Sequence, residues 1–434
     1  MVHNHHLEYR YPENINPSST SEAAFPRSDT SSASVASTSF NSKARPERSS
    51  TIHPDPSSAP HPDRTPPIHI DRSTPSQGLQ PLPPDMSPPL PSFLAGSKRT
   101  ESTFEQIPVI DFRDMVSEDK EKRQALAEKI RDACVNVGFF YLANPPASLF
   151  PPGLPETTIE KHAKPFFALP KETKTGWDIH KSANFKGYTA MHAEKTDTEA
   201  EGRGDWHEGF DVGWEEEGEV KGGEKDANGS AMAGANVWPP EEMLPGFRKG
   251  VMEYYHATVK LGLALFPLFA LALDMPEKFF EDKTTKPAAI LRLLHYPNQP
   301  PVSKKNGEMG IGRHTDYECF TLLWQQTGIT CLQVQNTAGR WVDAVPIEGS
   351  LVVNIGDQLA RWTNDVFKST PHRALNTSGK ERYSMPLFFG VDYDVPLEAI
   401  PTCVSEEMPA KYPVMKAGDY VKQRLEETYA HSKA

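Results

Sequence analysis

The sequence predicts a mainly β protein with flanking helices and a disordered N-terminal tail. Three observations carry this prediction. After Pro287, short apolar runs rich in β-forming residues follow one another closely, and turn residues separate them. Helical patterns precede and follow these runs. The first hundred residues, by contrast, are rich in proline and serine. Together these features indicate helices packed around a C-terminal antiparallel β-core.

Residues 1–103 form the predicted tail. The first 100 residues hold 17 of the 41 prolines and 19 serines, in stretches such as "SDTSSASVASTSFNS". Such a segment cannot bury enough apolar surface to offset the entropy lost on ordering, so we predict disorder here. About 330 residues remain, which is enough for one sizeable core.

Residues 104–285 are predicted to form a mixed, largely helical N-terminal domain. It begins with a short strand in "IPVIDF". A helix follows in "EDKEKRQALAEKIRDACVNVGFF", where Gly138 ends an apolar stripe at helical spacing formed by Leu126, Ile130, Ala133 and Val137. The later elements are a strand in "GFFYLAN", a helix in "PETTIEKHAKPFFALP" and a long buried helix in "FRKGVMEYYHATVKLGLALFPLFALAL".

Within this domain, residues 193–236 are acidic and rich in glycine. This composition predicts a long, lid-like loop, because loops of such length in compact domains are often functional. A variable surface insertion explains the same composition, and both interpretations stay open.

Residues 286–400 are predicted to form the β-core. Its strands are expected in "AILRLLHYP", "FTLLWQ", "CLQVQN", "RWVDAVP", "SLVVNIG", "HRALN" and "RYSMPLFFGVD". Their close spacing is typical of an all-β sandwich or barrel. A final helix, "AGDYVKQRLEETYAH", lies in the closing segment 401–434.

The charge of the chain limits its partners. The formal net charge is −12, and the first 100 residues contain nine Lys/Arg and nine Asp/Glu, so the acidic excess belongs to the folded part. An acidic body without a basic stripe argues against nucleic acid and against an anionic membrane surface as partners. A small molecule is the expected partner, and we expect a monomer.

The cysteines and the N-terminus bear on location. Cys134, Cys319, Cys331 and Cys403 are widely spaced and form no CxxC pair, which favours a reducing compartment. No apolar run reaches the ~18 residues of a membrane span. The N-terminal "MVHNHHLEYRYPEN" lacks the apolar core of a secretory signal. A cytoplasmic location is therefore expected.

Candidate metal ligands lie in "GIGRHTDYECFTLL" and downstream of it. His314 and Asp316 are two positions apart, so they point to the same side if the chain is extended there. His372, in "STPHRALN", begins a later β-type run that can return to the same place. Two histidines and one carboxylate are the ligand set of non-haem Fe(II), which keeps other coordination positions open. A polar turn before a buried strand is the structural alternative for the first pair.

Arg382 and Ser384, in "RYS", form a second constellation. They also share one face of an extended chain, ten residues after His372. Arginine presents a planar fork of donors that suits a carboxylate, and it keeps its charge when buried. The pair therefore predicts a carboxylate-binding site about one strand away from the metal.

These residues resemble the isopenicillin-N-synthase-like branch of the iron(II)/2-oxoglutarate-dependent dioxygenases. "HTD", His372 and "RYS" are similar to that family's site motifs. The likeness extends over about residues 105–430 and leaves the first hundred residues aside. Its other landmarks are "IPVIDF", "GFFYLAN", "FFALPKETK", "FKGY", "LLHYPNQP", the run that begins at Thr330, and "NIGDQLARWTNDVFKSTPHR".

The resemblance implies a double-stranded β-helix (jelly-roll) core. It implies that His314, Asp316 and His372 bind Fe(II), while Arg382 and Ser384, joined by Tyr296 of "HYP", bind the distal carboxylate of 2-oxoglutarate. It also implies the reaction. O2 and 2-oxoglutarate are consumed, succinate and CO2 are released, and a C–H bond of a small organic molecule is oxidised, with secondary metabolism as the expected setting.

Substrate-pocket residues are predicted more loosely. Phe389 in "PLFFGVD" and Phe320, which shares the face of Asp316 in a regular strand, are candidates. Tyr188 and Phe210 lie in or near the expected lid. Arg292 either meets an acidic group of the substrate or pairs with an acidic neighbour. The substrate itself and the outcome of its oxidation are not predicted.

Two other functions stay open at this point. An isopenicillin N synthase type of oxidase has the same fold and iron but needs no 2-oxoglutarate, and such enzymes also carry an Arg-x-Ser motif. A non-catalytic scaffold could instead use "PLPPDMSPPLP" as a polyproline segment for an aromatic groove.

Overall fold

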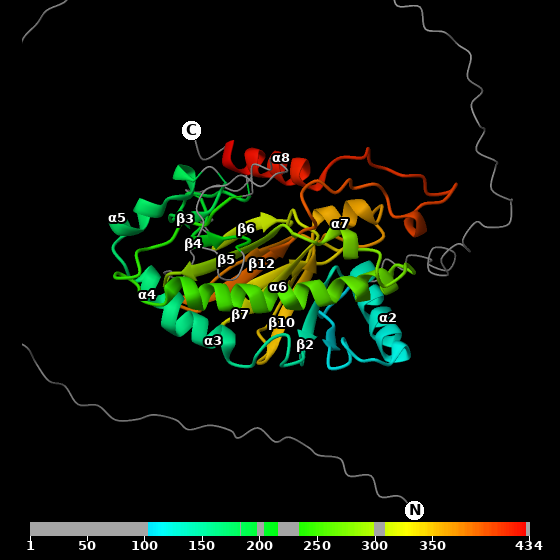
Figure 1. The fold of residues 1–434 in the computed structure, drawn as a ribbon, viewed down its shortest axis with the longest axis horizontal. Helices are drawn as coiled ribbons and strands as arrows, with labels where there is room; N and C mark the ends of the chain where they lie inside the picture. Colours follow the sequence, from blue (N-terminus) through cyan, green and yellow to red (C-terminus); the bar gives the residue numbers. More distant parts are fainter. Residues whose placement is uncertain (1–102, 183, 198–203, 216–233, 299–308, 431–434) are drawn as a thin grey trace, which may run out of the picture. The chain divides into compact units, whose positions relative to one another are not determined.

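The structure is a computed structural model, and it describes residues 103–182, 184–197, 204–215, 234–298 and 309–430 (Figure 1). The predicted disorder of residues 1–103 therefore falls outside the described residues, apart from Thr103. Parts of the 193–236 segment and the last four residues of the 401–434 segment also fall outside them.

The described residues form a strand-rich body with helices around it. The strands are β1 Val109–Asp111, β2 Phe139–Ala143, β3 Gly187–Thr189, β4 Glu208–Val212, β5 Ala289–Tyr296, β6 Ile311–His314, β7 Phe320–Gln325, β8 Leu332–Gln335, β9 Trp341–Asp343, β10 Ser350–Ile355, β11 His372–Ala374 and β12 Arg382–Phe389. The α-helices are α2 Lys120–Asn136, α3 Leu154–Thr158, α4 Lys164–Phe167, α5 Lys171–Lys174, α6 Phe247–Ala272, α7 Asp357–Trp362 and α8 Ala417–Ala430. Shorter helical turns are η1 Ile159–Ala163, η2 Thr175–Trp177, η3 Ile179–Lys181, η4 Glu281–Lys283 and η5 Pro401–Cys403.

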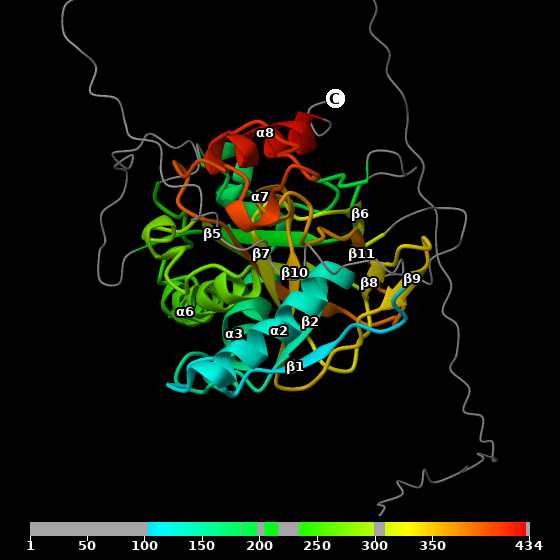
Figure 2. The ribbon, with the colours of Figure 1, turned by 90° about the vertical axis from the view of Figure 1, so that its right-hand side faces the viewer.

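Two sheets make up the core of this part of the chain. The larger has the strand order β1-β2-β10-β7-β12-β5-β4-β3, and the smaller has the order β6-β11-β8-β9. Figure 2 shows α6 on one side of the larger sheet and the smaller sheet on the other side. The predicted fold class, a mainly β jelly-roll core with flanking helices, is confirmed.

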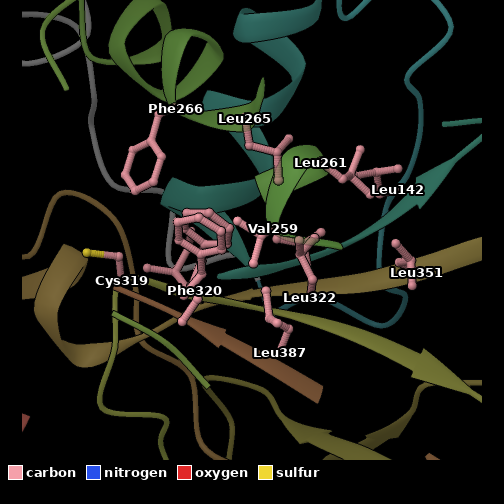
Figure 3. Close-up of a cluster of buried hydrophobic side chains, with 14 of the residues drawn as sticks. Leu142, Val259, Leu261, Leu265, Phe266, Cys319, Phe320, Leu322, Leu351 and Leu387 are labelled. Atoms are coloured by element: carbon pink, nitrogen blue, oxygen red, sulfur yellow. The ribbon is translucent and has the colours of Figure 1, made fainter. Parts of the chain in front are cut away.

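Helix α6 packs on the outer face of the larger sheet. Its apolar side chains meet those of the central strands in one buried cluster. Figure 3 labels Val259, Leu261, Leu265 and Phe266 of α6 and Phe320, Leu322, Leu351 and Leu387 of the strands beneath them. By length and composition α6 could also cross a membrane, but 67% of its most apolar window is buried inside the protein. Its apolar character is therefore explained by its place in the core.

The larger sheet joins segments that the sequence suggested as separate domains. Its inner strands β5, β7, β10 and β12 come from residues 286–400, whereas β1 and β2 at one edge and β3 and β4 at the other come from residues 104–285. Strand β2 pairs with β10, and β4 pairs with β5. The segments before and after residue 286 therefore contribute strands to the same sheet.

The predicted loop 193–236 contains the buried strand β4 and needs a correction. All five residues of β4 are buried, including Glu208 and Asp211. Lys174 and Arg292 pair with these two carboxylates. Acidic residues are normally exposed, so the sequence of this segment suggested a loop and not a buried strand. The cations that make their burial possible come from distant segments.

Replacing Glu208 with glutamine is expected to destabilise the fold. Glu208 accepts hydrogen bonds from Lys174 Nζ at 2.7 Å and from the Tyr188 hydroxyl at 2.6 Å, and its Oε1 lies 2.8 Å from His295 Nδ1. Removing one member of a buried ion pair leaves the other charge uncompensated, at a cost of about 3–5 kcal/mol. Urea denaturation measures this loss.

The control for this prediction is Glu160→Gln, which breaks an exposed pair with Lys164 and should cost less than about 0.5 kcal/mol. Burial raises the pKa of Glu208, but bonds from His295, Lys174 and Tyr188 outweigh it and hold that pKa below the ordinary 4.5. The stabilisation is therefore complete above about pH 4.5 and is lost as the pH falls through the lower, folded-state pKa. Equal stability of Glu208→Gln and Glu160→Gln at neutral pH would contradict this account.

Candidate metal centre and active-site cavity

Strand pairing brings two histidines together. His314 is the last residue of β6 and His372 the first residue of β11, and the antiparallel register places them directly opposite each other. Their ring centroids are 4.2 Å apart. His372 is buried, and its ring and that of Phe139 form a T-shaped contact with centroids 5.2 Å apart.

Asp316 completes the group from the loop between β6 and β7. Its Oδ1 lies 3.6 Å from Nε2 of His314 and 3.5 Å from Nε2 of His372. The candidate ligand atoms of the three residues lie within 4.8 Å of one another. The strand ends at His314, so Asp316 reaches the site from a loop rather than from a continuous strand. The three predicted metal ligands thus form a group that can hold one metal ion.

The orientation of the imidazole rings fits a metal. Nδ1 of His314 lies 2.8 Å from the carbonyl oxygen of Gly312, and Nδ1 of His372 lies 3.2 Å from that of Thr370. A carbonyl only accepts, so Nδ1 carries a proton in both rings, and Nε2 is the nitrogen that a metal ion can bind. Both Nε2 atoms face Asp316, and hydrogen bonds from the far ring nitrogen orient ligating histidines in the same way in metal sites.

Asp316 is held as a carboxylate. Its Oδ2 accepts hydrogen bonds from Thr321 Oγ1 and from Asn354 Nδ2, the latter at 2.7 Å. Burial raises the pKa of Asp316, but His372 and then His314 and Thr321 outweigh it and hold that pKa below its usual range. Burial and the neighbouring His372 lower the pKa of His314 to about 4. The carboxylate form of Asp316 and the neutral form of His314 are the forms that bind metals. Burial lowers the pKa of His372, but the charge of Asp316 outweighs it and raises that pKa, so a metal ion binds His372 by displacing the proton on Nε2.

Replacing Asn354 with alanine is expected to weaken Fe(II) binding by roughly 10–100-fold, the usual effect of losing a hydrogen-bond partner of a metal ligand. The reason is that Asn354 orients the Asp316 carboxylate without lying among the three ligands. Anaerobic titration with Fe(II) measures the change. Asn376→Ala is the matched control, because Asn376 is another buried asparagine whose amide bonds the carbonyl of Lys380 instead. Equal Fe(II) affinity of the two variants would refute the assignment.

Arg382 lies in the same cavity as the metal group and is 1% exposed. Its Nη1 donates to Ser384 Oγ at 3.2 Å and its Nη2 to Gln325 Oε1 at 3.3 Å. The guanidinium carbon lies 4.7 Å from the centroid of the Tyr296 ring. Within the described part of the chain its Nε has no hydrogen-bond partner. A buried, incompletely bonded guanidinium fits a carboxylate ligand, and 2-oxoglutarate supplies one.

The three candidate metal ligands and Arg382 line one cavity of about 170 Å³. Alternate residues of two paired strands form much of its wall: Ile290, Arg292, Leu294 and Tyr296 on β5, and Arg382, Ser384, Pro386 and Phe388 on β12. Val421 and Leu425 of α8 border it as well. All six predicted metal and carboxylate-binding residues line this cavity.

The structure corrects four of the five predicted substrate-pocket residues. Arg292 lines the cavity, but Phe389, Phe320, Tyr188 and Phe210 belong to the hydrophobic core. Phe389 and Phe320 stack on each other beneath α6, with centroids 5.2 Å apart. The irregular loop after Asp316 shifts the alternation, so Thr321 and not Phe320 shares its side.

Sequence reasoning missed several cavity residues. Phe388 lies an even number of positions after Arg382 and Ser384 on β12, so its side chain points to the same face of the strand. This alternation could have identified it from the sequence. Thr321 and Asn354, which bond Asp316, carried no sequence signal, nor did Glu194 and Asp211, which line the cavity. For Arg292 the structure shows the pairing with acidic neighbours. It borders the cavity, and it pairs with Asp211 at 2.6 Å and with Glu194 at 2.9 Å.

Glu318 is a further carboxyl on the cavity wall. It is 5% exposed, and its Oε2 has no hydrogen-bond partner among the described residues. Burial, and after it the charge of Asp316, raises the pKa of Glu318 to about 8.

Comparison with known families matches two parts of the chain. The family described as "non-haem dioxygenase in morphine synthesis N-terminal" matches residues 107–241. The 2OG-Fe(II) oxygenase superfamily matches residues 287–391, which include the three candidate metal ligands and Arg382.

Individual relatives agree with these matches. The chain is 33% identical over 333 residues to the 2-oxoglutarate-Fe(II) type oxidoreductase hxnY of Emericella nidulans, covering 75% of this chain and 91% of that protein. It is 34% identical to the 2-oxoglutarate-dependent dioxygenase traH of Penicillium crustosum, covering 69% and 89%. The crystal structure of a full-length Neurospora crassa protein in complex with alpha-KG and thymine is similar with a TM-score of 0.64 at 31% identity, covering 74% and 96%. This chain therefore belongs to the 2OG-Fe(II) oxygenase superfamily, as an oxygenase that uses Fe(II) and 2-oxoglutarate.

Proposed function

We propose that this enzyme oxidises a C–H bond of a small organic molecule in secondary metabolism. The observation that carries the proposal is the shared cavity. It combines a metal-binding group and a buried arginine with a further, largely apolar wall that includes Ile290 and Phe388. A wall of this kind suits a small organic molecule. Relatives with small-molecule names support the same class, among them Kihadalactone A synthase LFS of Citrus sinensis.

The residues divide the work between two ligands. His314, Asp316 and His372 hold Fe(II), and Arg382 with Ser384 and Tyr296 binds the distal carboxylate of 2-oxoglutarate. When bound, these cofactors consume O2, release succinate and CO2, and oxidise the C–H bond. The protein contributes orientation. The two Nδ1–H bonds fix the imidazole rings, and Arg382 holds the co-substrate in one direction.

Anaerobic reconstitution tests the function. Protein mixed with Fe(II) and 2-oxoglutarate should develop a weak visible charge-transfer band, and admission of O2 should then yield succinate. Neither signal should appear without 2-oxoglutarate. Substrate-dependent O2 uptake that is unchanged when 2-oxoglutarate is omitted would instead indicate an oxidase of the isopenicillin N synthase type.

We further propose that the enzyme is a cytoplasmic monomer that acts without nucleic acid or membrane partners. The net charge of −12 supports the absence of polyanionic partners. The four cysteines are buried and free, which suits a reducing compartment. Light scattering at micromolar concentration tests the monomer, and a mass twice that of the 48.3 kDa chain would contradict it.

A further inference from the structure

Helix α8 forms part of the wall of the active-site cavity. Val421 and Leu425 lie about one helical turn apart and both line the cavity. Arg424 follows Val421 by three positions and therefore lies on the same side of the helix. Figures 1 and 2 show α8 beside α7, and the side chain of Gln358 donates to the carbonyl of Ala417 at 3.1 Å. The place of the two apolar side chains in the cavity thus depends on how α8 is held against α7.

An ion pair joins α8 to Asp357, the first residue of α7. Arg424 Nη1 donates to Asp357 Oδ2 at 2.7 Å and to the Tyr420 hydroxyl at 3.1 Å. The side chains of Arg424 and Asp357 are only 29% and 14% exposed, so solvent screens this pair less than a surface pair. The guanidinium carbon of Arg424 also lies 4.5 Å from the centroid of the Tyr317 ring, which borders the cavity. A partly buried charged hydrogen bond and a ring contact therefore attach the helix beside the metal group.

Asp357 also bonds the two segments that carry the candidate metal ligands. Its Oδ2 accepts a hydrogen bond from Thr315 Oγ1 at 3.1 Å, and its Oδ1 accepts one from Ser369 Oγ at 2.6 Å. Its backbone N–H donates to the carbonyl of Asp316 at 2.8 Å. Thr315 stands between two of the candidate ligands, and Ser369 lies three positions before the third. One carboxylate thus connects α8, the loop of Asp316 and the segment that leads to His372.

We propose that Asp357 is a positioning residue that couples the docking of α8 to metal binding. Ligands that hold a metal ion restrain the loop of Asp316 and the segment before His372, and these segments orient the Asp357 carboxylate. The carboxylate in turn holds Arg424 and keeps the apolar side chains of α8 in the cavity wall. Coupling between two sites is reciprocal, so docking of α8 strengthens metal binding by the factor by which metal binding strengthens docking. The inference rests on the metal group of the proposed function and is independent of the molecule that is oxidised.

Hydrogen exchange and metal titration of the full-length protein test the coupling, with Mn(II) as the probe. Mass spectrometry of the exchanged protein reports the opening of α8, and calorimetric titration gives the Mn(II) affinity. In the original protein, saturating Mn(II) should slow the exchange of α8 by at least about fivefold, the lower end of typical couplings between sites. Arg424→Met removes the link to Asp357. In this variant Mn(II) should no longer slow the exchange of α8, and the Mn(II) affinity should fall by about the same factor.

Further variants probe both partners of the ion pair. Arg424→Lys keeps a cation opposite Asp357 and should restore part of both effects. Asp357→Asn should lose both effects, because a single amide oxygen cannot accept from the groups on both sides of a carboxylate. Lys422→Met and Asp365→Asn are the matched controls, since they break surface pairs on α8 and shortly after α7. Both controls should keep the Mn(II) affinity and the Mn(II) effect on exchange of the original protein.

The dependence on Mn(II) separates this coupling from a purely structural role of the ion pair. A structural pair would change the exchange of α8 by the same factor with and without metal. Exchange of α8 that does not respond to Mn(II) in the original protein would overturn the inference, as would Arg424→Met that keeps the Mn(II) effect and affinity. Circular dichroism establishes folding, and the two Arg424 variants decide the question if Asp357→Asn is unfolded. Failure of the proposed function would show separately, as absence of succinate release from 2-oxoglutarate.

Discussion

Replacing His372 with alanine is expected to abolish iron binding and succinate formation together. His372 offers Nε2 to the ligand group, and its Nδ1 is held by the carbonyl of Thr370. Loss of a hydrogen-bond partner of a ligand costs roughly 10–100-fold in metal affinity, so loss of the ligand itself should cost more than that. Anaerobic titration with Fe(II) and an assay of succinate from 2-oxoglutarate measure the two effects.

The control for this variant is His180→Ala, since His180 is an exposed histidine that interacts with Asp178. It should keep the Fe(II) affinity and the activity of the original protein. Circular dichroism and thermal denaturation establish that His372→Ala is folded. A folded His372→Ala protein that retains full Fe(II) affinity would disprove the metal assignment, and a retained biological output would favour a scaffold over an enzyme.

Replacing Arg382 with methionine should raise the KM for 2-oxoglutarate while leaving Fe(II) binding intact. Arg382 is buried beside Tyr296, and its Nε has no protein partner among the described residues. Truncating one partner of a buried charge pair costs about 2–5 kcal/mol. That corresponds to roughly 30-fold to several thousand-fold weaker binding of 2-oxoglutarate. Calorimetric titration with 2-oxoglutarate gives the affinity directly.

Arg382→Lys should fall between the original protein and Arg382→Met, because lysine keeps the charge but loses the planar fork. Arg340→Met is the control, since Arg340 forms an exposed pair with Glu105. Without 2-oxoglutarate, Arg382→Met should not be less stable than the original, because a buried charge is replaced by an apolar side chain of similar length. Unchanged affinity for 2-oxoglutarate in Arg382→Met would refute the assignment.

Most of the site could be predicted because its motifs are local. Arg382 and Ser384 lie two positions apart on β12 and therefore share one face, and the β6–β11 pairing brings His372 opposite His314. Asp316 is only two positions from His314, so it also reaches the site, although it does so from the loop after β6. The core strands were predictable for a similar reason, since each is a short run of β-forming residues bounded by turns.

What could not be predicted depends on contacts between distant segments. Strand β4 was not predicted because its two acidic residues suggest an exposed loop. Their burial depends on Lys174 and Arg292, which come from other segments of the chain. The side on which Phe320 lies depends on an irregular loop whose shape no residue count reveals. The contact between Glu318 and Gly390, the residue that follows β12, is also not visible in the sequence.

The shared sheet has a consequence for how the chain folds as it is synthesised. Leu142 of β2 pairs with Leu351 of β10. Strand β2 therefore cannot form this pairing until about two hundred further residues have been synthesised. At a synthesis rate of roughly 5–20 residues per second, this wait lasts on the order of 10–40 s. During that interval the edge of β2 that pairs with β10 is open, and unpaired edges of this kind invite aggregation. The nascent chain is therefore most open to aggregation before β10 has left the ribosome.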